Sequence, residues 1–269
     1  MEGQLKLSLG IFAGLLLATS SATLARADES QELAKKLANP ISSLISVPFQ
    51  SNYDCCYGPK DAYRYTLNIQ PVVPFSLNDD WNLIVRTIVP FVYQESPATG
   101  FDSRFGLSDT TQSFFFSPAN TENGVTWGVG PVFLWPTATD HQLGTEKWGA
   151  GPTGVILKQH GGWTYGALAN HIWSYAGHED RDDVSQSFIQ PFLTFTFPDT
   201  TALTLTSETS YDWVSKEWTV LINAGISKVF KFGEQRVSIG VLGRYYAAAP
   251  DNGPKWGARF VTTFLFPEK

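Results

Sequence analysis

A period-two alternation of apolar and polar residues between Ile41 and Phe266 is the feature that most constrains the fold of this chain. Successive side chains of a β-strand point to opposite faces, so this pattern predicts strands with one apolar face and one polar face. From 63 to 70, for example, Tyr, Leu and Ile alternate with Arg, Thr, Asn and Gln. Twelve segments have strand-like composition with turn residues between them: 41–53, 62–75, 80–93, 107–117, 125–136, 147–159, 162–175, 184–197, 202–212, 217–231, 236–247 and 256–266.

The connections between these segments alternate in length. One set is short: 76–79, 118–124, 160–161, 198–201 and 232–235. The other set is mostly longer and more polar: 54–61, 94–106, 137–146, 176–183, 213–216 and 248–255. An even number of antiparallel strands with short turns at one end and longer loops at the other is typical of a bacterial outer-membrane barrel. A soluble β-sandwich shows the same alternation along its strands, so the alternation alone leaves both folds open.

The nine tryptophans separate the two folds, because all of them lie near the ends of predicted strands. Amphipathic indole rings prefer the two lipid–water interfaces and form aromatic girdles there, whereas a soluble core would bury them at mid-strand. The sequence therefore predicts an all-β fold, a closed antiparallel transmembrane β-barrel of about twelve strands. The predicted periplasmic girdle consists of Trp81, Trp127 and Trp163. The predicted outer girdle consists of Trp135, Trp148, Trp173, Trp213, Trp218 and Trp256.

The N-terminal residues predict export to the outer membrane. The apolar run from Leu7 to Ala18 is too short for a transmembrane helix, and an A-x-A cleavage site follows at 25–27. We expect residues 1–27 to be a signal peptide, 28–40 to form a short periplasmic helix, and 41–269 to form the barrel. This location implies outer-membrane lipid, lipopolysaccharide and the barrel-assembly machinery as partners. The net charge of −6 gives no reason to expect nucleic acid, which favours a basic patch.

Four prolines fall inside predicted strands: Pro71, Pro131, Pro152 and Pro191. Proline has no N–H for the ladder and is normally confined to edges or bulges. A closed barrel has no free edge, so we expect β-bulges at these positions. A bulge would also reverse the inward and outward phase of the residues that follow it.

The only two cysteines, Cys55 and Cys56, are adjacent. Neighbouring Cα atoms lie about 3.8 Å apart, which is shorter than the usual span of a disulfide. We therefore expect no disulfide, and an incidental pair in the first outer loop rather than a redox or metal site.

Inward-facing polar residues would line the lumen of such a barrel. Strand parity assigns ten residues to this face: Arg64, Asn68, Gln70, Arg86, Gln186, Gln190, Glu208, Asn223, Arg244 and Arg259. Lys158 is a further candidate for this face, although Pro152 makes its phase uncertain. An Arg or Lys facing lipid at the midplane costs about 2–4 kcal/mol, so the arginines are expected inside.

The inward charges bear on selectivity. Four arginines against Glu208 predict a modest anion preference if the lumen is open, because rings of basic side chains select anions. The alternative is a structural network that fills the lumen. Eight-stranded barrels are filled and barrels of sixteen or more strands are open, so twelve strands leave the question undecided. We also expect that Glu29 and Glu32 could enter the periplasmic mouth and pair with the arginines as a plug.

An enzyme is the main rival, since outer-membrane phospholipase A is also a barrel. Such an enzyme needs a nucleophile and a base within hydrogen-bonding reach. The nearest candidates, His171 and Ser174, point to opposite faces of a strand, so His171 is interpreted as an interfacial residue beside Trp173. No G-x-S-x-G and no H-E-x-x-H motif occurs, and no cofactor is expected.

A polar loop offers one weak candidate for a metal site. Its carboxylates, Glu179, Asp180, Asp182 and Asp183, are of a type that binds a hard divalent ion such as Ca²⁺. Their spacing is not that of an EF-hand, so a solvated acidic loop is the preferred interpretation.

Several motifs resemble one bacterial family over nearly the whole mature chain. They are residues 39–50, 67–72, 127–131, 147–152 and 167–173. The chain resembles the outer-membrane transporters that are grouped with proteins of the phenol meta-cleavage pathway, some of which carry the label neuromedin U. The resemblance implies an outer-membrane barrel with a transport role and points to small organic or aromatic compounds, but it supplies no agreed substrate and no catalytic residues. The adjacent cysteines depart from the family's pattern.

Together these observations predict a non-enzymatic barrel that passes small solutes passively across the outer membrane. Two alternatives stay open: a barrel enzyme of the phospholipase type, and a structural or adhesive barrel with a closed lumen.

Overall fold

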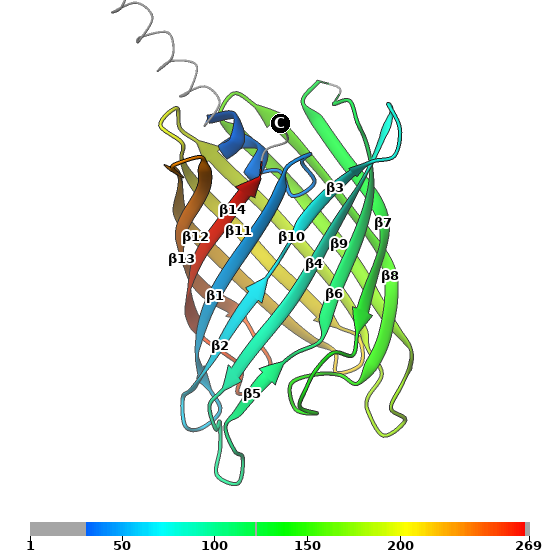
Figure 1. The fold of residues 1–269 in the computed structure, drawn as a ribbon. Helices are drawn as coiled ribbons and strands as arrows, with labels where there is room; N and C mark the ends of the chain where they lie inside the picture. Colours follow the sequence, from blue (N-terminus) through cyan, green and yellow to red (C-terminus); the bar gives the residue numbers. More distant parts are fainter. Residues whose placement is uncertain (1–30, 122, 267–269) are drawn as a thin grey trace, which may run out of the picture.

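The structure, a computed structural model, describes residues 31–121 and 123–266. Its strands form one sheet that closes on itself, because the first strand pairs antiparallel with the last (Figure 1). The strands are β1 (Ile45–Tyr57), β2 (Ala62–Ile69), β3 (Val72–Ser76), β4 (Trp81–Gln94), β5 (Arg104–Leu107), β6 (Thr110–Pro118), β7 (Val125–Trp135), β8 (Lys147–His160), β9 (Trp163–Gly177), β10 (Ser185–Thr196), β11 (Thr201–Asp212), β12 (Glu217–Phe232), β13 (Gln235–Ala248) and β14 (Trp256–Phe266). The predicted closed antiparallel barrel is confirmed.

The fourteen strands occupy twelve positions in the barrel wall. β2 and β3 lie one after the other between β1 and β4, with an unchanged register on both neighbours. β5 and β6 likewise follow one another along β4, but the register there shifts by one residue between them. The predicted strand number is therefore confirmed, with two of the wall positions each interrupted once.

Several predicted boundaries were wrong. The first strand begins at Ile45 rather than Ile41 and continues to Tyr57, so its loop is shorter than predicted. Part of the predicted loop 94–106 is strand β5, because its residues continue the hydrogen bonding along β4. Residues 41–44, which precede β1, lie inside the barrel instead of in its wall.

The predicted bulges at the prolines were wrong. Pro131 and Pro152 stand opposite each other in the β7–β8 pair, and the register is the same on both sides of them. Pro191 likewise pairs with Ala167 without a shift. Pro71 separates β2 from β3, again with no change of register. The missing N–H removes rungs to one neighbouring strand and leaves the alternation in phase.

A short helix spans residues 31–37 and lies at the same end of the barrel as the short turns (Figure 1). One of these turns is the Gly161–Gly162 connection of β8 and β9, where the positive φ of 59° at Gly161 fits a tight hairpin. The predicted signal peptide, 1–27, lies outside the described residues. No helix within 31–121 or 123–266 has the length and apolar character needed to cross a bilayer.

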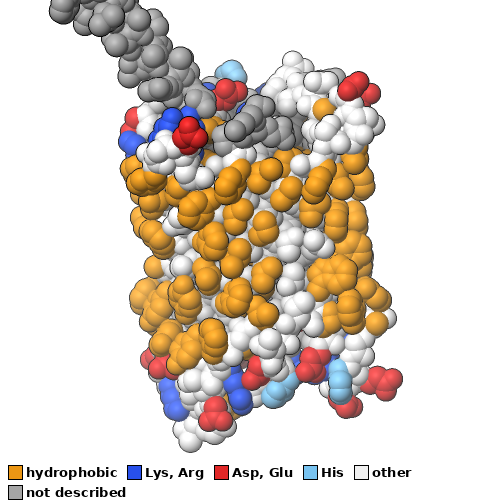
Figure 2. Space-filling view, in the orientation of Figure 1, with side chains coloured by type: hydrophobic (Ala, Val, Ile, Leu, Met, Phe, Trp, Pro, Cys, Tyr) orange, Lys and Arg blue, Asp and Glu red, His pale blue; other side chains and the backbone are white. Residues whose placement is uncertain are grey.

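The outer surface carries a broad apolar belt between two charged rims. On the face shown in Figure 2, hydrophobic side chains cover the middle of the barrel, while Lys, Arg, Asp and Glu gather at its two ends. Exposed residues of the belt include Ile156, Leu205 and Val241, at 57%, 49% and 53% of their surface. A closed ladder leaves no unpaired strand edge in lipid, so the belt and the closure together fit a barrel that spans a bilayer.

Candidate functional site in the barrel lumen

Two buried ion pairs and one asparagine join the inward faces of four strands. Arg244 of β13 donates to both carboxylate oxygens of Asp54 of β1, at 2.8 and 3.3 Å. Arg259 of β14 donates to both carboxylate oxygens of Glu208 of β11, at 2.7 and 3.1 Å. The Oδ1 of Asn52 accepts a hydrogen bond from each arginine. Each buried guanidinium therefore forms a bidentate pair with a carboxylate. This geometry offsets the cost of removing the charges from water.

The strand register brings these partners together. Asn52 stands opposite Arg259 in the β1–β14 pair, and opposite residues of an antiparallel pair share a face. Gly257 stands opposite Asp54, and a side chain at that glycine would collide with the Asp54 carboxylate. The glycine thus leaves the space that Asp54 needs to reach Arg244.

Two other inward arginines have amide partners rather than carboxylates. Arg86 donates to Oε1 of Gln70 at 3.1 Å, and Gln70 in turn donates to Oε1 of Gln50 at 3.0 Å. Arg64 donates to Oε1 of Gln94 at 2.6 Å. Within 31–121 and 123–266, neither arginine has a carboxylate within the 4.0 Å limit of an ion pair. Two cations in the lumen are therefore not neutralised by direct contact.

The structure divides the remaining residues that parity assigned to the lumen. Asn223 is fully buried and donates to Thr206, and Gln190 lines a cavity. Asn68 of β2 stands opposite Gln50 of β1, so both side chains lie on the same face of the sheet. Gln186 is exposed near the outer end of β10. Lys158 has the same parity as the exposed belt residues of β8 and points away from the lumen, so its assignment to the interior was wrong.

The opposite arc of the barrel presents an apolar wall to the lumen. One buried cluster draws on β4, β6, β8 and β9, and a second draws on β7 and β9. The first contains Ile41, Ile84, Phe115, Val155, Leu157 and Leu168. The second contains Val132, Leu134 and Ile172. The four arginines lie on β2, β4, β13 and β14, so the lumen has a basic arc and an apolar arc.

The N-terminal segment crosses the mouth of the barrel at the short-turn end. Leu33 and Ala34 of the helix pack against Leu265 at one side of the mouth, in a cluster with β12 and β14 residues. Ile41 reaches the apolar cluster at the other side. Glu32 is exposed and forms no ion pair with a described residue, so its predicted contact with the arginines was wrong; Glu29 lies outside the described residues. Apolar packing joins the described part of this segment to the barrel, together with a hydrogen bond of 2.9 Å from Gln159 to the carbonyl oxygen of Lys35.

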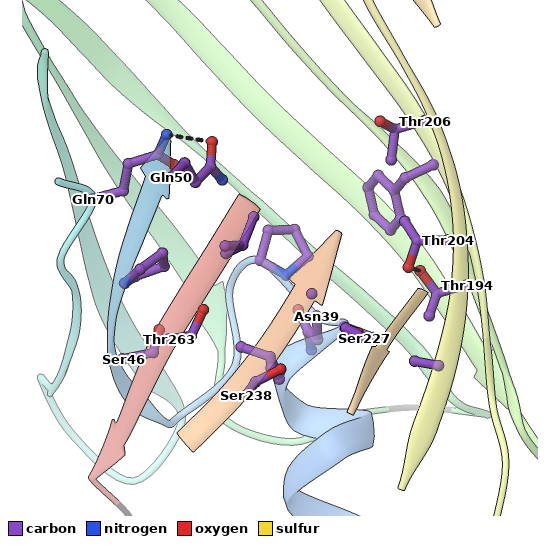
Figure 3. A pocket seen from close by; sticks show the side chains of 18 of the residues that line it. Asn39, Ser46, Gln50, Gln70, Thr194, Thr204, Thr206, Ser227, Ser238 and Thr263 are labelled. Carbon is purple, nitrogen blue, oxygen red and sulfur yellow. Dashed lines mark hydrogen bonds between the residues drawn. The ribbon is translucent and has the colours of Figure 1, made fainter. Parts of the chain in front are cut away.

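Two cavities remain in the lumen. The inner one, of about 280 Å³, lies between the N-terminal segment and the barrel wall (Figure 3). Arg86 and Arg259 are among the residues that line it. The outer one, of about 590 Å³, lies among the long loops and is lined by Arg64, Arg104 and Arg181. The paired arginines of the central network lie between the two ends. Space for small solutes therefore exists at both mouths, with side chains between them.

The tryptophans lie at the ends of strands, as the sequence indicates. Trp81 begins β4, and its ring contacts that of Trp127 with 5.9 Å between centroids. At the other end, Trp135 and Trp148 are in contact at 5.5 Å. All of them except Trp135 have between 38% and 55% of their surface exposed. Rings at these positions are placed to lie at the two interfaces of a bilayer.

His171 lies on the outer face beside Trp173, with 4.0 Å between ring centroids. Its Nδ1 is 2.7 Å from the Oγ of Ser187 on the adjacent strand β10. The Nε1 of Trp213 donates to the same Ser187 oxygen at 2.9 Å. Ser174 points to the other face and donates to Asp183. The sequence pattern missed the contact with Ser187, because it depends on the pairing of β9 with β10.

The acidic loop 178–183 does not gather its carboxylates around a common centre. Among the described residues, no group of three or more His, Cys, Asp or Glu side chains is arranged to hold a metal. Asp183 accepts a hydrogen bond from Lys147 at 3.1 Å, and this bond lowers the pKa of the Asp183 carboxyl. The other three carboxylates of the loop are exposed.

Cys55 and Cys56 form a disulfide, although the spacing of adjacent residues argued against one. Their Cα atoms are 3.7 Å apart, because the bond closes a ring between adjacent residues rather than bridging two separate segments. Cys56 has a positive φ of 79°, and the register of β1 on β2 shifts between Asp54 and Tyr57. The disulfide therefore occupies an irregularity at the end of β1, directly after the Asp54 partner of the central network.

Cysteine labelling tests the phase of the barrel at two adjacent residues of β11. Thr206 lines the inner cavity, and Leu205 is exposed on the belt. In a Cys55→Ser, Cys56→Ser background in lipid vesicles, we expect Thr206→Cys to react with a small water-soluble thiol reagent and Leu205→Cys to resist it. The reversed reactivity would show that the faces are assigned the wrong way round.

Comparison with known proteins gives a fold relationship. The sequence matches no known protein family and no curated protein. The structure is similar to an outer-membrane channel from Pseudomonas putida, with a TM-score of 0.66, 14% identity, and coverage of 83% of this chain and 96% of that chain. Outer membrane phospholipase A from Escherichia coli has a TM-score of 0.44, 13% identity, and coverage of 87% and 98%. That second likeness is too weak to support an argument about function. The chain has the same barrel fold as an outer-membrane channel.

Proposed function

We propose that this protein is an outer-membrane channel for the passive passage of small solutes. The observation that carries the proposal is a closed barrel with an apolar outer belt and a lumen that contains a cavity at each end. A barrel whose purpose is only structural does not need open volume at both mouths. The family that the motifs resemble extends the proposal to small organic or aromatic compounds.

The charges of the central lumen support a modest anion preference. Arg64, Arg86, Arg244 and Arg259 face the lumen, and the carboxylates of this set are Asp54 and Glu208, which leaves two positive charges in excess (four minus two). The sequence analysis counted only Glu208, because Asp54 was assigned to a loop. The excess is smaller than that count implied, but its sign is the same.

Liposome swelling tests the passage of solutes. We expect vesicles that contain the mature chain to swell in small organic solutes, at rates that fall steeply as solute size increases, because the inner cavity holds only about 280 Å³. Protein-free vesicles are the control for leakage. Vesicles that swell no faster than the control would favour a closed structural barrel.

A phospholipase-type enzyme is the second candidate, and the His171–Ser187 contact is the observation that favours it. A serine within hydrogen-bonding distance of a histidine is the minimum of a nucleophile–base pair. No described carboxylate contacts His171, however, so no third group of the usual kind orients the base. Under the channel proposal, purified protein does not hydrolyse phospholipid vesicles. Hydrolysis that Ser187→Ala abolishes would establish the enzyme instead.

A further inference from the structure

The inner cavity brings the basic arc and the apolar arc of the lumen into one small space. Arg86 and Gln70 line it on one side, and Leu168 and Phe192 line it on the other. Small polar residues from β1 and β10–β14 complete the wall, and the N-terminal segment lies along one side, as Figure 3 shows for Asn39. The volume of about 280 Å³ is close to the lower end, about 300 Å³, of small-molecule sites. The space therefore suits a compact ligand with both a polar and an apolar part.

Arg86 has the donors and the charge for an anionic group. Among the described residues Arg86 donates one hydrogen bond, to Gln70, which Gln50 holds in position. Glu208 is the acidic group whose charge acts on Arg86, and both oxygens of Glu208 are already bonded to Arg259. A guanidinium has five N–H donors in a planar fork that matches a carboxylate. Arg86 thus retains several donors that its protein neighbours do not use.

The apolar side of the cavity decides what kind of anion fits. Leu168 is buried in the cluster that also contains Phe115, and Phe192 packs against that cluster. An inorganic anion would leave this wall without a contact, and a neutral hydrocarbon would leave Arg86 without one. Burial of apolar surface contributes about 25 cal/mol per Å². A ligand that contacts both Arg86 and the apolar wall is therefore favoured over an inorganic anion and over a neutral hydrocarbon.

We propose that the inner cavity binds a small organic monocarboxylate, with its carboxylate on Arg86 and its apolar body against Leu168 and Phe192. This inference rests on the proposed channel function, since the site would lie on the path of the solute. Arg64, whose hydrogen-bond partner is Gln94 rather than a carboxylate, stands at the outer cavity and presents a cation to the same solutes on entry.

Calorimetric titration of the purified mature chain in detergent tests the site without requiring conduction. Benzoate serves as the probe, benzyl alcohol as the neutral analogue, and acetate as the carboxylate without an apolar body. We expect benzoate to bind more tightly than either analogue. Equal affinities for benzoate and benzyl alcohol, or for benzoate and acetate, would overturn the proposal.

Substitutions on each side of the cavity test what that side contributes to binding. Arg86→Gln keeps a hydrogen-bonding partner for Gln70 and is expected to weaken benzoate binding by ~10-fold or more, with little effect on benzyl alcohol. Arg86→Lys should recover part of the loss, and Leu168→Ala should weaken benzoate more than acetate. Lys158→Gln, which removes a cation that points away from the lumen, is the control and should bind benzoate as the unmodified chain does. Unchanged binding in a folded Arg86→Gln protein would refute the site.

The swelling and titration results separate the two proposals. Benzoate binding without solute passage would contradict the channel and leave the site in place. Solute passage without benzoate binding would contradict the site and leave the channel in place.

Discussion

Replacing Asp54 with alanine is expected to lower the free energy of unfolding by about 3–5 kcal/mol, because it leaves a buried arginine without its carboxylate. The side chains of Asp54 and Arg244 have only 7% and 6% of their surface exposed, and two hydrogen bonds join them. Unfolding in urea, followed by tryptophan fluorescence of protein folded into lipid vesicles, measures the change.

Two further variants make this result specific. Asp199→Ala removes an exposed partner of Lys228 in a short turn, and we expect only a small change from it. The double replacement Asp54→Ala, Arg244→Met removes both buried charges and should recover much of the stability lost in the single variant. If Asp54→Ala is no less stable than Asp199→Ala, the central network does not hold the barrel as described.

Removing the N-terminal segment is expected to raise the single-channel conductance several-fold. Residues 31–40 cross the mouth of the barrel and line the inner cavity, so their deletion opens the path at its narrow end. Conductance of the deleted and full mature chains in planar bilayers measures the effect. A milder variant, Leu33→Asn with Ala34→Asn, should loosen the same contacts without shortening the chain.

A substitution on the other face of the helix is the control. Lys36 is exposed, so Lys36→Gln should leave the conductance unchanged. Equal conductance in the full chain and the deletion would show that the segment does not obstruct the path.

The sequence was sufficient to predict the barrel, because its signals are local. The alternation of side chains follows from strand geometry alone, and the interfacial tryptophans depend only on distance from the strand ends. Strand parity placed Arg86, Arg244 and Arg259 on the inner face for the same reason. The assignment of faces by strand parity holds across the prolines, because Pro131, Pro152 and Pro191 interrupt ladder contacts without shifting the register.

The contacts within the lumen could not be predicted, because they depend on which strands close the barrel. Asp54 was assigned to a loop, yet the pairing of β1 with β14 extends that strand past it and brings it to Arg244. Ile41 continues the apolar alternation of β1, but it folds into the lumen. The one signal that was available is the parity of Asp54, which lies two residues after Asn52 and four after Gln50 and so shares their polar face.

The apolar wall was also missed, for a related reason. The sequence analysis assigned only polar residues to the lumen, so Phe115 and Leu157 were not among the candidates. In the structure they face inward and pack against Ile41. The inward face of a barrel can hold apolar residues wherever a segment inside the barrel packs against them. The sequence of a single strand does not show whether such a segment is present.

Current through single molecules of the mature chain in a planar bilayer tests the central claim most directly. With a salt gradient across the bilayer, the account predicts discrete conductance steps and a reversal potential whose sign indicates a modest preference for anions, because two positive charges of the central lumen are in excess. The absence of conductance from both the full chain and the deletion of residues 31–40, or a preference for cations in both, would contradict it.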